Sequence, residues 1–271
     1  MTGDDVSSGY LLSLAAVVAL LPVTLLAWRR PGIGTPSFWI LLAVAIAGAG
    51  TVVAVHQGHG WTPGLSQALW ATIGACLLLF AGLGALVRES LRLSILLLPY
   101  LLLLGLLATC VAGLPSSPIS VGPATAWLDL HIIVSVSTYG LVTLAAVASL
   151  ALFLQERALK AKRPTAITRA LPAMTDCEAL EVRLMAVGLF VLGVGLLTGM
   201  ATEYMERHTL LVLDHKTVFS LLAFLAIGAL LLLHRLSGLR GRRAARIALL
   251  AYLFLTLAYP GVKVVTQIIL A

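Results

Sequence analysis

Long apolar stretches dominate the chain, and short polar segments separate them. A helix needs about 20 mostly apolar residues to cross the hydrocarbon core of a bilayer, and eight stretches reach that length. They run approximately over Tyr10–Trp28, Pro36–His56, Leu65–Val87, Leu93–Gly113, Trp127–Leu154, Val182–Thr202, Thr217–Leu236 and Ile247–Ile269. The pattern predicts an all-α fold: a polytopic membrane helical bundle of about eight transmembrane helices, forming a single transmembrane domain over residues 1–271.

Composition supports this interpretation, because 60% of the residues are hydrophobic and only 11% are charged. So little polar surface excludes a water-soluble fold. The net charge of +7 would suggest nucleic-acid binding in a soluble domain. In a membrane protein, however, basic residues mark cytoplasmic loops and anionic headgroups, so we expect membrane lipid and no nucleic acid as a partner.

Basic residues are concentrated in alternate loops, which gives the expected orientation. The loops on the other side contain only two basic residues, Arg207 and Lys216. The positive-inside rule therefore places both termini outside and indicates the inner membrane of a bacterium, although an organelle of bacterial descent would give the same signal. The basic loops contain Arg29, Arg30, Arg88, Arg92, Arg157, Lys160, Lys162, Arg163, Arg169, Arg235, Arg240, Arg242, Arg243 and Arg246.

The local structure of three further segments can be predicted from their residues. Gln155–Glu181 is expected to extend the fifth helix into the cytoplasm, break near Pro164 and start a new helix after Pro172. The proline-rich segment Leu114–Ala126 suits an external loop. Gly195 and Gly199 form a G-x-x-x-G pattern, which predicts close helix packing.

The sequence lacks the motifs of the common catalytic mechanisms. Cys76, Cys110 and Cys177 form no C-x-x-C pair, and there is no H-E-x-x-H, G-x-S-x-G or P-loop pattern. We therefore expect neither covalent haem attachment nor a common protease, hydrolase or nucleotide-driven mechanism.

Histidines are the informative residues, because ionisable groups at membrane depth are costly and often functional. Of the six, His234 alone falls near the inner end of a helix. The other five, His56, His59, His131, His208 and His215, lie at or near the outer face in the predicted topology.

His131 is the best ligand candidate, because it sits about one turn inside the outer end of the fifth helix and neutral imidazole can ligate haem iron or a transition metal. Alternatively, it bonds Asp129 or Tyr139, or lies at headgroup level. His215 follows Asp214, which could cap the next helix, so a structural role there is about as plausible as a ligand role. His56 and His59 could form a metal pair, but neighbouring glycines favour a loop.

Three sequence features together resemble the cytochrome c assembly protein family of haem-handling membrane proteins, and within it the CcsA-like, YpjD-type inner-membrane subgroup. The resemblance is strongest over residues 127–271, and for the first four helices it rests on their number and order. The features are Leu130-His131 with Ser137-Thr138-Tyr139-Gly140, the segment LPAMTDCEALEVRLMAVGLFVLGVGLLTGM, and the segment DHKTVFSLLAFLAIGALLLLHRLSGLRGRRAA.

The resemblance implies specific haem ligands. His131, with Tyr139, matches an outer haem-ligand motif, and His234, before GLRGRR, matches a histidine assigned to a haem site within the membrane. The chain departs from the family where a tryptophan-rich haem-binding segment would stand, since Leu211–Lys216 has no tryptophan, and it has no histidine near the C-terminus. His56 is closer to the outer loop than the family pattern predicts. We therefore expect a reduced haem-handling role, and the resemblance implies that this role is haem positioning rather than bond-making catalysis.

The leading hypothesis is a protein that binds haem b non-covalently and assists cytochrome c biogenesis, with other cytochrome c assembly proteins as partners. His131 would be an outer ligand paired with His215, or less favourably with His56, and His234 would serve a separate inner site. An alternative is a small-solute or divalent-metal permease, or an accessory transport subunit. A third is a scaffold whose histidines satisfy only local hydrogen bonds.

Overall fold

A computed structural model describes residues 3–32, 34–57, 64–113, 125–208 and 214–261. These ranges contain helices and their connections and no strand. Seven of the described helical segments are long and apolar enough to cross a membrane. The prediction of an all-α polytopic bundle is confirmed, and the chain is a multi-pass membrane protein. The chain forms two compact units: Met1–Ile119 with Thr165–Pro172, and Ser120–Pro164 with Ala173–Ala271.

The first unit is built around contacts among its four long helices. Helix α1 packs against α2 and α4, and α3 packs against α2, α4 and the short helix η1. Trp70 and Phe80 of α3 are completely buried in its core. The bounds are α1 Gly3–Arg29, α2 Pro36–Gln57, α3 Leu65–Leu86, η1 Arg88–Leu93, α4 Ser94–Cys110 and α6 Ala166–Ala170.

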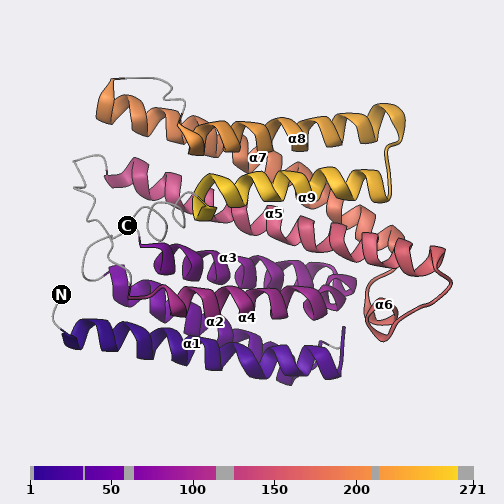
Figure 1. The fold of residues 1–271 in the computed structure, drawn as a ribbon, viewed down its shortest axis with the longest axis horizontal. Coiled ribbons are helices and arrows are strands. Elements are labelled where there is room, and N and C mark those ends of the chain that lie inside the picture. Colours follow the sequence, from indigo (N-terminus) through magenta and orange to yellow (C-terminus); the bar gives the residue numbers. More distant parts are fainter. Residues whose placement is uncertain (1–2, 33, 58–63, 114–124, 209–213, 262–271) are drawn as a thin grey trace. The chain divides into compact units, whose positions relative to one another are not determined.

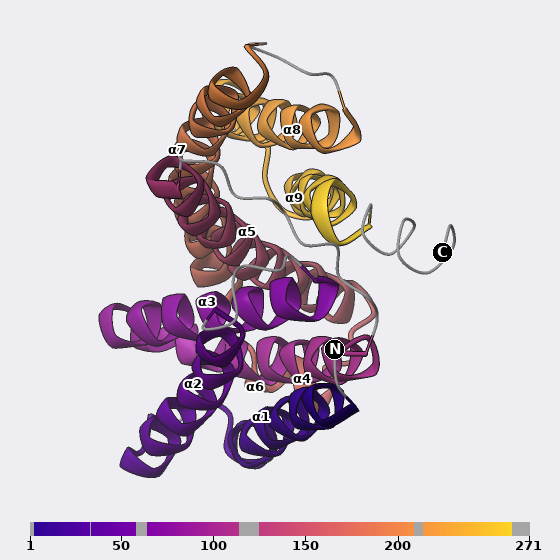
Figure 2. The ribbon, with the colours of Figure 1, turned by 90° about the vertical axis from the view of Figure 1, so that its left-hand side faces the viewer.

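The second unit contains four long helices and a terminal π-helical turn. Helices α5 and α7 form its most extensive contact, and α9 packs against α5 and α8, as Figures 1 and 2 show. Small buried side chains, including Ala148 and Ala151 of α5 and Ala244 and Ala248 of α9, allow these backbones to approach closely. The bounds are α5 Thr125–Lys160, α7 Met174–Arg207, α8 His215–Ser237, α9 Arg242–Thr256 and η2 Leu257–Gly261.

The polar connector behaves as the sequence predicts. Helix α5 continues to Lys160, the helix is interrupted around Pro164, and α7 begins at Met174. The eighth predicted span differs in form, because α9 starts earlier than expected and gives way to a π-helical turn at Leu257. The rest of that predicted span lies outside the described residues.

The helix directions in the second unit define two ends. The starts of α5 and α8 lie at the same end as the last turn of α7, at the left of Figure 1. The α8–α9 turn and the last turn of α5 lie at the other end. His131 and His215 therefore belong to one end of this unit and His234 to the opposite end, as the sequence predicts.

Candidate functional site

His131 lies between α5 and α7, where it is half-buried. Its Nδ1 is 3.1 Å from Oγ1 of Thr198 on α7, and its Nε2 is 3.4 Å from the hydroxyl of Ser135 one turn along α5. The ring therefore contacts Thr198 and Ser135. Asp129 and Tyr139, which the sequence suggested as possible hydrogen-bond partners, are not among its described contacts. Thr198 and Ser135 together hold the ring in one orientation.

The Thr198 contact is compatible with one neutral form of the ring. In the tautomer with its hydrogen on Nδ1, the Thr198 oxygen accepts that hydrogen, while the Thr198 hydroxyl donates its own to the Gly195 carbonyl oxygen at 3.1 Å. Nε2 of the neutral ring then carries a lone pair, and its contact with Ser135 is long for a hydrogen bond. Nε2 is therefore the ring atom able to coordinate a metal ion.

The G-x-x-x-G pattern of α7 provides space for this arrangement. A Cβ atom at Gly199 would lie 3.0 Å from Cε1 of His131, and a Cβ at Gly195 would lie 3.4 Å from the Val134 side chain. The predicted close packing at these glycines is confirmed. The side chain that packs against Gly199 is His131, the candidate ligand.

Tyr139 takes part in a separate polar contact within the same unit. Its hydroxyl is 3.1 Å from the Thr256 hydroxyl and 3.5 Å from the Tyr252 hydroxyl, both on α9. These bonds join α5 to α9 next to the π-helical turn. The two residues of the His131–Tyr139 motif therefore connect α5 to different helices.

His215 is the first residue of α8 and is exposed. The preceding Asp214 is the N-cap, and its carboxylate accepts the Thr217 backbone N–H at 2.8 Å. This cap confirms the structural role of the Asp214–His215 segment without testing a ligand role for His215. No described hydrogen bond or ring contact joins His215 to His131, and their pairing stays a prediction.

The remaining outer histidines are less informative. His56 lies in the last turn of α2, and its side chain is not among those described. His59 lies outside the described residues. His208 ends α7 in a left-handed conformation with φ 55° and is exposed. Within the described ranges, no group of three or more His, Cys, Asp or Glu side chains could hold a metal ion.

His234 supports the turn between α8 and α9. Its Nδ1 is 3.0 Å from the Leu239 carbonyl oxygen, to which it donates a hydrogen bond. Gly238 ends α8 in the left-handed region, and Gly241 precedes α9 with φ 65° and ψ −141°, a conformation essentially restricted to glycine. The glycines of GLRGRR are therefore required by the backbone of a tight turn.

Two acidic residues fix this turn to the neighbouring helices. Glu156 of α5 accepts the Arg242 backbone N–H at 2.9 Å and the Lys160 ammonium at 2.6 Å. Glu178 of α7 pairs with Arg240 at 3.2 Å. The Arg242 guanidinium lies over the Phe153 ring of α5, 5.2 Å from its centre. The start of α9 thus contacts α5, and the turn before it contacts α7.

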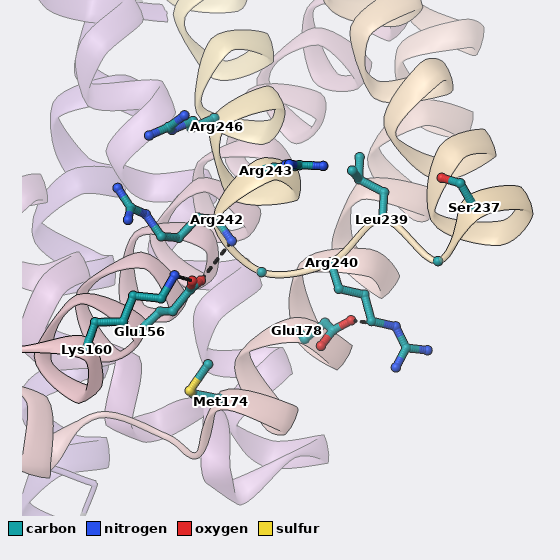
Figure 3. A pocket seen from close by; sticks show the side chains of 12 residues that line it. Glu156, Lys160, Met174, Glu178, Ser237, Leu239, Arg240, Arg242, Arg243 and Arg246 are labelled. Carbon is teal, nitrogen blue, oxygen red and sulfur yellow. Dashed lines mark hydrogen bonds and ion pairs between the residues drawn. The ribbon is translucent and has the colours of Figure 1, made fainter.

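An open pocket of about 940 Å³ surrounds the turn, and Figure 3 shows its side chains. Five basic and two acidic residues line it, so its net charge is positive. The charged residues are Glu156, Lys160, Glu178, Arg240, Arg242, Arg243 and Arg246.

The sequence profile of the family described as "Cytochrome C assembly protein" matches residues 61–270. The chain belongs to the cytochrome c assembly protein family. The match confirms the resemblance and extends it to the third and fourth helices, beyond the range 127–271 in which the motifs were clearest.

Two relatives illustrate the similarity. The "28.8 kDa protein in nifR3-like 5'region" of Azospirillum brasilense is 50% identical over 269 residues, which cover 97% of this chain and 99% of the relative. "Inner membrane protein YpjD" of Escherichia coli K12 is 30% identical over 177 residues, covering 64% of this chain and 65% of the relative. No solved structure matches this chain.

Proposed function

We propose that this chain handles haem in the inner membrane and assists cytochrome c biogenesis, binding haem b non-covalently through His131. Membership of the cytochrome c assembly protein family suggests the biogenesis role. The name of the similar "Inner membrane protein YpjD" supports the location. We expect other cytochrome c assembly proteins as partners.

The orientation of His131 is the observation that supports haem binding. The Thr198 hydroxyl occupies Nδ1 at 3.1 Å, and Ser135 makes only a 3.4 Å contact with Nε2. A ligand to iron needs an unprotonated nitrogen, a fixed ring and a second hydrogen bond on the opposite nitrogen. In the tautomer with its hydrogen on Nδ1, His131 meets all three requirements, so its donor chemistry fits a ligand to haem iron.

The other histidines would have separate parts in this function. His215 begins α8 at the same end of the second unit and is the candidate second ligand for His131. His56 is the weaker alternative. His234 would belong to a second haem site at the opposite end, where the Leu239 carbonyl oxygen already orients its ring. Bound haem would supply a redox-active iron, and the chain would hold and orient it.

Absorption spectroscopy of the detergent-purified protein, oxidised and dithionite-reduced, tests the proposal. We expect a Soret band in the wild type that weakens or shifts in His131→Ala. His208→Asn is the matched control, because it changes an exposed histidine at the same end while keeping a residue type tolerated at positive φ. A featureless wild-type spectrum, under conditions where a known haem protein loads fully, would contradict haem binding. A spectrum unchanged by His131→Ala would contradict this ligand assignment.

A further inference from the structure

The pocket at the α8–α9 turn has two acidic groups, and the protein's own donors occupy them. Glu156 accepts bonds from Lys160 and from the Arg242 backbone, and Glu178 pairs with Arg240. These contacts serve to hold the turn. They leave the arginines of the first turns of α9 as the source of the pocket's excess positive charge.

Three arginines carry this excess charge, and the guanidinium of one of them, Arg242, lies over the Phe153 ring, which leaves Arg243 and Arg246. Both are exposed, and neither has an ion pair within the described part of the chain. Figure 3 shows their side chains extending from successive turns of α9, Arg243 toward Leu239 and Arg246 on the other side of the helix axis in this view. Guanidinium groups bind phosphate through paired N–H donors, so this end of α9 is suited to a phosphate-bearing ligand.

The same face of α9 continues as an apolar surface. Positions 243, 246, 250, 253 and 257 fall on one stripe of a helix, because residues three and four apart are neighbours. Leu250, Leu253 and Leu257 are 45%, 49% and 37% exposed. The opposite face is buried through Ala244, Ala248 and Ala251. An exposed stripe that begins with two arginines and continues with three leucines matches a phospholipid, whose phosphate precedes its acyl chains.

The position of the pocket across the membrane agrees with this ligand. Trp127, near the start of α5, is 44% exposed, as expected for a tryptophan at a membrane interface. About 44 Å of helix separate Trp127 from Glu156 at 1.5 Å per residue, and a bilayer with its headgroups is about 40–45 Å thick. Glu156 therefore lies at the opposite headgroup level, on the side that the basic loops place in the cytoplasm.

We propose that the pocket is a binding site for an anionic phospholipid of the inner leaflet, with its phosphate on Arg243 and Arg246 and an acyl chain along Leu250 and Leu253. This site is independent of haem. It differs from general attraction to a charged membrane, because it requires these two arginines and the leucines that follow them.

Native mass spectrometry of the delipidated, full-length protein tests the site, using phosphatidylglycerol and phosphatidylcholine with identical acyl chains as probes. We expect wild type to retain phosphatidylglycerol preferentially and Arg243→Gln/Arg246→Gln to lose that preference by roughly tenfold. Arg243→Lys/Arg246→Lys should keep part of the preference for phosphatidylglycerol, because lysine keeps the positive charge but lacks the paired N–H donors of a guanidinium group. Arg29→Gln/Arg30→Gln, which removes two exposed arginines at the end of α1, is the matched control and should behave as wild type.

Three results would overturn the proposal. One is the absence of any preference for phosphatidylglycerol in the wild type. Another is a preference that survives Arg243→Gln/Arg246→Gln or falls equally in Arg29→Gln/Arg30→Gln, which would indicate surface charge alone. The third is displacement of the lipid by inorganic phosphate at equal concentration, which would indicate a site for free phosphate.

Discussion

At His131 the protein gives each ring nitrogen a different environment, and this difference supports the proposal that the residue acts as a ligand. Nδ1 has a buried partner, Thr198, whose own hydrogen goes to the Gly195 carbonyl oxygen. Nε2 has only the distant Ser135 hydroxyl. His234 shows the complementary use of the same side chain, because its Nδ1–H stabilises a turn.

If His131 ligates haem as proposed, replacement of Thr198 by valine should weaken haem binding without removing the ligand. The variant keeps the side-chain shape but loses the acceptor for Nδ1–H, so the tautomer and the ring orientation are no longer fixed. Loss of such an outer partner lowers metal affinity about 10–100-fold. Haem titration followed at the Soret band measures the effect.

Thr202→Val is the control for that experiment, because Thr202 is a buried threonine of the same helix whose hydroxyl donates to the Thr198 carbonyl oxygen rather than to His131. Equal haem affinity in Thr198→Val and wild type would show that the Thr198 hydroxyl does not orient the ligand.

Sequence reasoning could identify His131 but not its partners. The Thr198 position is 67 residues away, and its role depends on how α5 and α7 align. The G-x-x-x-G pattern signals close packing at Gly199, but it does not specify which side chain of the facing helix fills the space. Residue types alone thus locate a candidate ligand, whereas the register between helices decides what orients it.

Among the elements, the α8–α9 turn is held by several independent contacts. It has two glycines at positive φ, an internal hydrogen bond from His234, and carboxylates from α5 and α7 on either side. The sequence shows the glycines and arginines together. It cannot show that Glu156 and Glu178, far away in the chain, fix them in place.

Gly241→Ala should destabilise the protein by about 1–3 kcal/mol, the usual cost of a non-glycine residue in a conformation of this kind. The added Cβ would also lie 3.1 Å from Oε2 of Glu156. Thermal denaturation in detergent measures the loss. Gly238→Asn is the comparison, because Gly238 is in the left-handed region that asparagine tolerates. An equal melting temperature for Gly241→Ala and wild type would refute the argument.

Asp214→Ala should cost about 1 kcal/mol, because it removes the side-chain acceptor at the start of α8. Partial burial works to raise the pKa of the Asp214 carboxyl, but hydrogen bonds from Thr217 and the nearby Lys216 and His215 outweigh it, so the pKa is lowered. The stabilisation is therefore present above the ordinary pKa of 3.8 and is lost as the pH falls through the lower value of the folded protein. Melting curves of both proteins should differ at pH 7 and converge in strong acid, and a constant difference would exclude the carboxylate as its source.

For the whole molecule, hydropathy is sufficient to predict the helical membrane architecture. Runs of apolar residues define spanning helices because the bilayer sets their length. The same reasoning did not predict the π-helical turn after Thr256 or the division of the chain into two compact units. These features depend on packing between helices, which a hydrophobic pattern does not encode.

The predicted orientation can be tested with single cysteines in a Cys110→Ser background, because the other two cysteines, Cys76 and Cys177, are buried. Both Ala161→Cys and His208→Cys replace exposed residues, at opposite ends of the second unit. In intact bacterial cells, a membrane-impermeant maleimide should label the cysteine at 208 and not the one at 161. Permeabilised cells should show labelling at both positions. The reverse pattern in intact cells would invert the topology.

The tight α8–α9 connection also determines where the protein can be engineered. Residues 238–241 have no spare length, since two of them adopt special backbone conformations and the turn is bonded to α5 and α7. A rigid fusion partner inserted there, for example as a marker for electron microscopy, would displace α9 from its neighbours. The exposed stretch 161–163 follows α5, and its described backbone hydrogen bonds run only to the last turns of that helix. A marker is therefore better joined at 161–163 than in the α8–α9 turn.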